Sequence, residues 1–196
     1  QAEDPTAEDN TPIKLRNNKF TQLFESLTGM YGWPNYGEFD PTPILAPFFL
    51  LFFAMCMGDC GYGILLMIIG VLIAKKKLNI EMFDGLGPII TVLGVGTTVV
   101  GFFLGTFMGI DLYNAEWMPQ ALKSVMIKGE VMGYDIQMVL ALCIGVFHIC
   151  LAMVVKAICY TKQFGFKENI ATWGWTLLIV GGLLVAILGM TILPAV

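Results

Sequence analysis

The sequence predicts an all-α fold: a polytopic transmembrane bundle of about five membrane helices. First, 57% of the residues are hydrophobic and only 13% are charged, with a mean hydropathy of +0.75, which is outside the usual balance of a soluble domain. Second, the apolar residues gather in long runs separated by polar segments. Third, the basic residues lie between these runs in a pattern that favours one orientation in a membrane.

The chain begins with two segments that precede the apolar runs. Residues 1–13 are acidic and contain proline, which predicts an extended linker that cannot bury enough surface to fold alone. Because this start has no initiating Met and no signal peptide, we expect the chain to begin within a larger protein. Residues 14–43 form a juxtamembrane segment, in which apolar residues from Leu15 to Leu27 at roughly helical spacing predict a short interfacial helix.

The first apolar run is too long for one membrane crossing. It covers residues 44–74, and as one helix it would reach about 45 Å, against about 30 Å of hydrocarbon core. Residues 58–63 (GDCGYG) interrupt it with three glycines around a carboxylate. We therefore predict two short spans, 44–59 and 60–75, joined by this turn.

The charge distribution supports two crossings, because cytoplasmic loops carry an excess of Lys and Arg. If the first run crosses twice, nine of the eleven basic residues share one side, against two on the other. If it crosses once, the division is five against six. The hairpin is therefore favoured, with a cytoplasmic N-terminus. The four basic groups are Lys14, Arg16 and Lys19; Lys75, Lys76 and Lys77; Lys123 and Lys128; and Lys156, Lys162 and Lys167.

Three longer spans come next, at about 87–108, 137–160 and 172–193. Pro88 suits a helix start, and Trp173 and Trp175 are placed as an aromatic belt would be. The polar residues 109–135 are predicted to lie outside, with a short amphipathic helix near residues 118–127. Together the spans make residues 44–196 a transmembrane domain.

Asp59 is the most prominent candidate for chemistry, because a carboxylate within a hydrophobic run is costly. One interpretation is a proton or sodium relay. The other is a helix cap, in which its oxygens accept the amide hydrogens of Gly61 or Tyr62 and a basic residue of a neighbouring helix pairs with it.

His148 and Lys156 are the other polar candidates within the spans. His148, the single histidine, could belong to a proton path or be a neutral hydrogen-bond partner between helices. Lys156 lies eight positions later on a similar face, where it could reach the cytoplasmic interface or pair with an acidic group.

Glycines mark the expected helix packing. Gly101, Gly105 and Gly109 recur every four residues, which would leave one face of the third span bare and let another helix approach. Gly58, Gly61 and Gly63 are expected to contribute to packing around the turn in the same way.

The sequence offers little support for other functions. No nucleophile and base pair, phosphate loop, dinucleotide fingerprint or metal-ligand cluster is present, so no catalytic residue, cofactor or metal is predicted. The five cysteines lie in apolar stretches without the spacing of a zinc site. The net charge of -4 and the lack of a basic stripe argue against nucleic acid.

Several motifs resemble the membrane domain of the V-type ATPase a subunit, called subunit I in bacteria and archaea. The order and spacing of the central motifs are specific, and the resemblance covers nearly all of the chain after the linker. The motifs are residues 36–43 (YGEFDPTP), 46–49 (APFF) and 58–63 (GDCGYG), with weaker similarity at 15–18 (LRNN), 24–25, 30–31 and 145–148.

The resemblance implies a stator subunit of a rotary ATPase. Such a subunit is fixed beside a rotor ring of small membrane subunits and provides two half-channels for protons or sodium ions, coupled to ATP hydrolysis. The family's rotor-facing arginine and its N-terminal stator domain would lie outside this chain, whose single arginine is Arg16. The fragment would then hold bracing helices in a bacterial or archaeal cytoplasmic membrane, with the other V-type ATPase subunits as partners. Which ion is carried, and whether the complex pumps or synthesises ATP, stay open.

Two alternatives remain. A free-standing secondary transporter would use a broken helix at a midplane substrate site, but it predicts an inverted repeat, and no repeat relates the first two spans to the last three. A structural membrane protein without ion traffic is the second alternative.

Overall fold

The computed structural model describes residues 14–34, 38–78, 83, 85–131 and 133–192, with side chains as far as residue 185. The predicted linker at residues 1–13 lies outside the described residues. The chain divides into two compact units, Gln1–Ala141 and Leu142–Val196. Helix α6 crosses this boundary.

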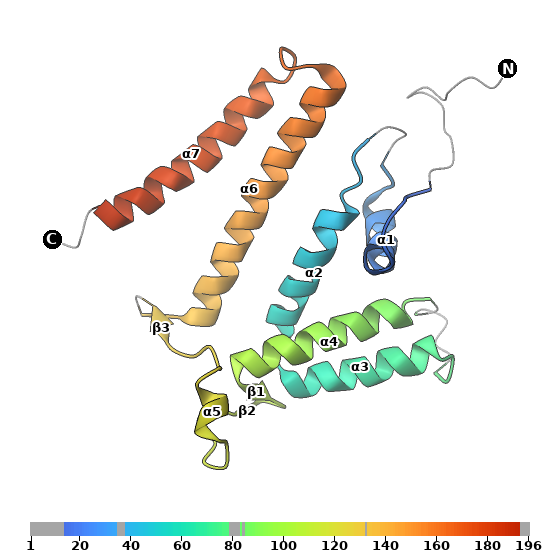
Figure 1. Cartoon of the computed structure of the whole chain (residues 1–196), viewed down its shortest axis with the longest axis vertical. Helices are drawn as coiled ribbons and strands as arrows, with labels where there is room; N and C mark the ends of the chain where they lie inside the picture. The colour runs from blue at the N-terminus through green and yellow to red at the C-terminus, as the bar shows by residue number, and fades with distance from the viewer. Residues whose placement is uncertain (1–13, 35–37, 79–82, 84, 132, 193–196) are drawn as a thin grey trace. The chain divides into compact units, whose positions relative to one another are not determined.

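The described residues are mostly helical (Figure 1). The only strands among them form two short antiparallel ribbons, β1 with β2 and β3 with β4. The elements in order are α1 (Lys19–Tyr31), α2 (Thr42–Met57), α3 (Cys60–Ala74), α4 (Gly87–Leu104), β1 (Thr106–Phe107), β2 (Ile110–Asp111), α5 (Gln120–Lys123), β3 (Glu130–Val131), β4 (Tyr134–Asp135), α6 (Ile136–Phe164) and α7 (Ile170–Ile192).

Two of these helices are long and apolar enough to cross a membrane by length and composition, α4 with a mean hydropathy of 1.9 and α6 with 2.7. Helices α2 and α3 and the segment Ile170–Val185 of α7 are apolar but shorter. The break between α2 and α3 lies at Gly58 and Asp59, within the predicted turn.

Helix α1 packs onto the start of the bundle. Its Phe24 is fully buried in a cluster with Ala46 of α2 and with Ile89 and Leu93 of α4, and its ring meets Phe49 edge-on, with 6.3 Å between the centroids. This burial is a consequence of the sequence, because the apolar residues of α1 recur at helical spacing and cover one face of the helix.

Hydrogen bonds tie both ends of α1 to the residues that start α2. The hydroxyl groups of Thr28 and Thr42 lie 2.9 Å apart and are buried. The side-chain amide of Asn17 donates to Glu25 Oε1 at 2.9 Å and to Asp40 Oδ2 at 2.7 Å. The juxtamembrane segment is therefore fixed to the bundle over its described residues.

Helices α3 and α4 lie side by side and are the most closely packed pair of helices in the first unit (Figure 1). Glycines allow their backbones to touch, because a Cβ at any of five positions would collide with a backbone nitrogen of the other helix. The pairs are Gly101 with Cys60, Gly63 with Thr98, Gly94 with Met67, Gly70 with Thr91 and Gly87 with Ala74. The glycines alternate between the helices and are seven residues apart within each, so the contact recurs on one face every two turns.

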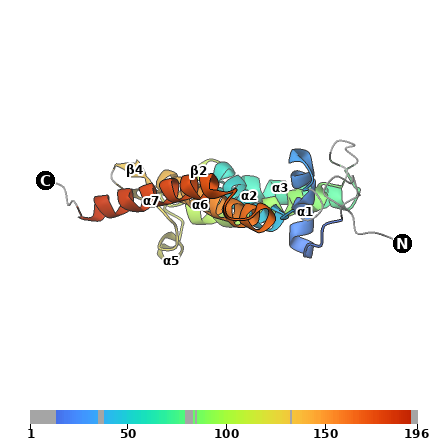
Figure 2. The same ribbon diagram turned by 90° about the horizontal axis from the view of Figure 1, so that it is seen from above.

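In the second unit, α6 reverses into α7 through a short turn, seen from a second direction in Figure 2. Gly165 takes a φ of 87°, which favours glycine. The side-chain amide of Asn169, only 6% exposed, donates to the carbonyls of Tyr160 and Gly165. Trp173 Nε1 donates to Thr161 Oγ1 at 2.8 Å, so both indole and amide side chains fasten the turn.

Candidate functional site

The candidate site is built on the break between α2 and α3. Gly58 ends α2 in a left-handed conformation, with φ at 56°, and its amide donates to the carbonyl of Ala54 at 2.9 Å. Asp59 is extended and begins α3 as its N-cap, with Oδ1 accepting the amide of Tyr62 at 3.1 Å. A glycine C-cap directly before an aspartate N-cap is a sequence that stops one helix and starts another.

The same carboxylate also holds a distant turn. Asp59 Oδ1 accepts the amide of Met108, and Asp59 Oδ2 accepts the amide of Gly109, both at 2.8 Å. Met108 and Gly109 are the two residues between β1 and β2, with φ angles of 50° and 79°. Positive φ at both positions is the geometry of the tight hairpin turn of type I′. Asp59, 5% exposed, therefore joins the helix break to the tip of a hairpin.

Two further contacts bring the hairpin and the break together. Thr106 Oγ1 donates to the carbonyl of Gly58 at 2.9 Å. A Cβ at Gly61 would overlap the Met108 side chain and press against its amide, so glycine there lets the turn come close. We call Gly58, Asp59, Gly61, Thr106, Met108 and Gly109 the clasp.

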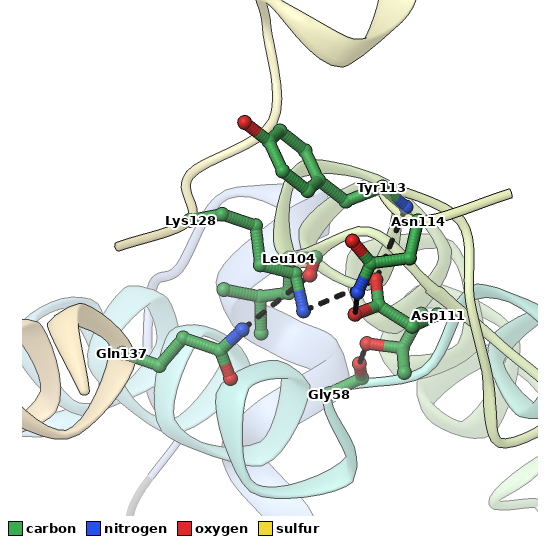
Figure 3. A network of polar contacts seen from close by, with 8 residues as sticks. Gly58, Leu104, Asp111, Tyr113, Asn114, Lys128 and Gln137 are labelled. Carbon is green, nitrogen blue, oxygen red and sulfur yellow. Dashed lines mark hydrogen bonds and ion pairs between the residues drawn. The ribbon is translucent and has the colours of Figure 1, made fainter. Parts of the chain in front are cut away.

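The residues after the clasp extend it through a network of polar contacts (Figure 3). Asp111 pairs with Lys128 at 3.5 Å and accepts the side-chain amide of Asn114 at 2.9 Å. Gln137, in the first turn of α6, reaches the carbonyl of Leu104 at 3.4 Å. In the same loop, Leu112, Met118 and Met126 form a small buried cluster.

The amphipathic helix predicted near residues 118–127 is reduced to the four residues of α5. The apolar residues of the predicted helix do not line one helical face, because the side chains of Met118 and Met126 pack in the buried cluster instead. The amide of Ile127 donates to the carbonyl of Phe103 at 2.7 Å, which pulls this part of the chain back to the end of α4.

The glycines of the third span also differ from the predicted ladder. Helix α4 ends at Leu104, so only Gly101 presents a bare helical face, and it meets the backbone of Asp59 and Cys60. Gly105 is the left-handed C-cap of α4, with φ at 68°. Gly109 belongs to the hairpin turn and has no atom within 4 Å of a Cβ built on it. The four-residue spacing therefore reflects three different local requirements.

Comparison with known proteins assigns this first unit to a family. Residues 2–121 match the V-type ATPase 116kDa subunit family. The chain belongs to this family. The matched residues include the whole clasp and the α3 and α4 pair, so these features lie in the part of the chain that the family defines.

Individual relatives agree with this assignment. Subunit I of the A-type ATP synthase of Methanocaldococcus jannaschii is 42% identical over 108 residues, covering 55% of this chain and 16% of the relative. The same subunit of Pyrococcus horikoshii is 34% identical over 185 residues, covering 88% and 26%. A V-type ATP synthase subunit I of Treponema pallidum is 27% identical over 203 residues, covering 96% and 30%. The chain thus spans between 16% and 30% of the length of these curated family members.

The other predicted polar residues lie in the second unit, whereas Asp59 lies in the first. His148 is a partly buried residue within α6. Lys156 places its ammonium 5.5 Å from the centre of the Tyr160 ring, one turn further along α6, which is a cation–π contact. The acidic partner considered from the sequence stays a prediction. Among the described residues no group of three or more His, Cys, Asp or Glu side chains could hold a metal ion.

Sequence reasoning about Asp59 missed the hairpin partners, the amides of Met108 and Gly109. A usable pattern exists, because residues 106–111 (TFMGID) place a glycine at the second turn position between short segments with β-branched residues. The pattern was obscured by the apolar run that precedes it, which made these residues look like the end of a membrane span.

Proposed function

We propose that this chain is the N-terminal part of the membrane domain of subunit I, the stator subunit of a rotary A/V-type ATPase. The complete subunit provides the path for protons or sodium ions beside the rotor ring, coupled to ATP hydrolysis. The observation that carries the proposal is the family match over residues 2–121, together with relatives named as ATP synthase subunit I over most of the chain.

Five membrane helices fit this role: α2, α3, α4, α6 and α7. The end of α2, the start of α3 and the end of α4 all meet at the clasp. Three successive crossings that alternate in direction would bring these ends to the same face of the bilayer. Together with the nine basic residues on the opposite side, this favours a cytoplasmic N-terminus and an extracytoplasmic clasp.

Within the subunit, this part is a brace rather than the ion path. Helices α3 and α4 touch backbone to backbone at five glycines, which leaves no space for water between them along that face. A groove of about 450 Å³ near the end of α2 is also unsuited to an ion path, since its lining contains no Asp, Glu, His, Lys or Arg. Its lining residues are Phe52, Met55, Cys56, Leu104, Gln137, Met138 and Ala141.

Purification of the full-length subunit from its own membranes tests the proposal. An affinity tag on the subunit should recover the nucleotide-binding head and the rotor ring, and the complex in liposomes should accumulate protons or sodium ions when ATP is added. Ionophores selective for each ion identify the one carried. Recovery of the subunit alone, with solute transport that needs no ATP, would contradict the proposal and support a secondary transporter.

A further inference from the structure

We infer that Asp59 is a positioning residue that clasps the β1–β2 hairpin to the break between α2 and α3 and so fixes the loop of residues 105–126, rather than an ion carrier. This role is local to the first unit and does not depend on the proposed function. It gives the acid a task that the helix cap alone does not explain.

Asp59 accepts more hydrogen bonds than a helix cap requires, and some of them come from residues far away in the sequence. A helix cap needs one backbone amide, which Tyr62 supplies. Asp59 accepts two more, and they come from residues 49 and 50 positions away in the sequence. Hydrogen bonds to a charged acceptor are about twice as strong as those between neutral groups. Two of these three bonds go to the hairpin, at 2.8 Å each, against 3.1 Å for the cap bond from Tyr62.

The turn that those bonds hold has an unfavourable backbone conformation. Met108 has a φ of 50°, which is costly for a residue with a side chain and usually taken by Gly, Asn or Asp in such turns. Two consecutive amides of a turn pointing at one anion form a backbone nest. The Asp59 carboxylate occupies this nest and offsets the strain at Met108. Gly61 makes the approach possible because a side chain there would strike the turn.

The residues directly after the hairpin depend on its position. The amide of Leu112 donates to the carbonyl of Gly105 at 2.8 Å, directly after β2. Leu112 then enters the buried cluster with Met118 and Met126. A displaced hairpin would therefore carry Leu112 out of this cluster and loosen the residues packed around it.

The variant Asp59→Asn distinguishes this positioning role from the two alternatives, an ion relay and a simple helix cap. Asparagine is as good a helix N-cap as aspartate, so the start of α3 is kept. Its side chain has one acceptor oxygen, and the Nδ2 group that replaces the other oxygen is a donor. At least one turn amide, that of Met108 or Gly109, then faces a donor instead of an acceptor.

Hydrogen exchange by mass spectrometry, on the full-length subunit in the assembled ATPase, tests the clasp. In Asp59→Asn we expect peptides covering residues 105–112 to exchange at least about tenfold faster, since the loss of a charge-assisted hydrogen bond is of that size. Peptides from the middle of α3 and α4 should be unchanged. Asp111→Asn is the matched control, because it makes the same change of side chain within the hairpin itself, at a more exposed site, and leaves the clasp intact.

A second substitution can restore protection from exchange only if Asp59 acts through the turn, which general destabilisation of the subunit would not predict. Met108→Gly removes the strain of the positive φ, so the double variant Asp59→Asn with Met108→Gly should recover part of the lost protection. Thr106→Val tests the clasp without altering charge, and serves if Asp59→Asn fails to assemble. It deletes only the hydrogen bond to Gly58 and should speed exchange of residues 105–112 by about two- to fivefold.

Wild-type exchange at residues 105–112 in Asp59→Asn would overturn the inference. ATP-driven transport measured on the same sample then separates the alternatives: abolished transport with an unchanged hairpin identifies an ion relay, and unchanged transport identifies a simple cap. If Asp59→Asn does not assemble, wild-type exchange in Thr106→Val overturns the inference equally.

Discussion

At the residue scale, the three glycines of residues 58–63 each meet a separate requirement. Gly58 has a positive φ that ends α2. Gly61 faces the hairpin turn, and Gly63 faces the backbone of Thr97 and Thr98 in α4. The segment is therefore not a generic flexible turn, because only the first of its glycines is there for its φ angle, and the other two are there for the space they leave.

Asn169 provides a residue-scale prediction in the second unit. Asn169→Ala removes an amide that donates to two carbonyls near the end of α6 and is 6% exposed. The loss of two part-buried hydrogen bonds from a buried side chain should lower the free energy of unfolding by about 1–3 kcal/mol. Thermal unfolding of the purified subunit in detergent measures this as a lower midpoint temperature.

Asn114→Ala is the control for this variant. Asn114 also donates through its side-chain amide, to Asp111 at 2.9 Å, but the bond is exposed. Its removal should cost less than about 1 kcal/mol, because water replaces the lost partner. Equal losses of stability in the two variants would show that burial of Asn169 does not matter as argued.

At the element scale, the α3 and α4 pair shows how two apolar helices can associate without large interlocking side chains. Apolar burial cannot drive such packing in lipid, where the tails are as apolar as leucine. Close backbone approach replaces it, through glycines that alternate between the helices. The threonines opposite Gly63 and Gly70 keep their hydroxyl groups satisfied by bonding to carbonyls one turn earlier.

Gly94→Ala should separate α3 from α4. The added methyl group would overlap the backbone of Met67, which cannot move as a flexible side chain could, so we expect at least about 1–3 kcal/mol of destabilisation. Gly145→Ala is the matched control, since Gly145 also lies within an apolar helix but has open space around a Cβ. Alanine there should be neutral or stabilise α6 by up to about 1 kcal/mol. Thermal midpoints that fall equally in both variants would contradict the backbone contact.

The contact between α1 and α2 gives a further prediction at this scale. Thr42 is fully buried, and its hydroxyl group meets both Thr28 and Asp40. Thr42→Val should destabilise the subunit by about 1–3 kcal/mol, because the buried Thr28 and the half-buried Asp40 each lose a partner. Thr97→Val is the matched control. Thr97 is equally buried, but its hydroxyl group bonds only to the carbonyl of Leu93 within its own helix, so less than about 1 kcal/mol should be lost. A similar drop in thermal midpoint for both would refute the tie between α1 and α2.

Hydropathy predicts a mostly helical chain, as the structure shows, but not the contacts between its helices. Hydropathy and the GDCGYG segment placed the break of the first run at the residues where α2 ends and α3 begins. Four-residue glycine spacing in the third span suggested one packing face, whereas the actual packing glycines recur every seven residues and come from both helices. A pattern shared between two segments, like the hydrogen bonds from Met108 and Gly109 to Asp59, cannot be found from the periodicity of one segment.

At the scale of the whole molecule, the antiparallel α3 and α4 pair determines which loops can share a side of the membrane. The clasp brings the start of α3 together with the end of α4, and the two helices are in contact from Cys60 with Gly101 to Ala74 with Gly87. They therefore run antiparallel. The lysines after α3 must lie at the opposite end of this pair from the hairpin, whatever the orientation of the pair in a bilayer.

Cysteine labelling of the full-length subunit tests the orientation. After replacement of the five native cysteines, single cysteines replace the exposed residues Lys19, Lys76, Glu116 and Glu168 in separate variants. With intact, right-side-out vesicles, a membrane-impermeant maleimide should label only the cysteine at position 116. The other three positions should react after permeabilisation, since two short crossings by α2 and α3 place them together with most of the basic residues. If α2 and α3 made one crossing, position 19 would instead lie on the opposite side from position 76, because those two positions flank the run. Labelling of these two positions from opposite faces would rule out the double crossing, and with it the cytoplasmic placement of both loops.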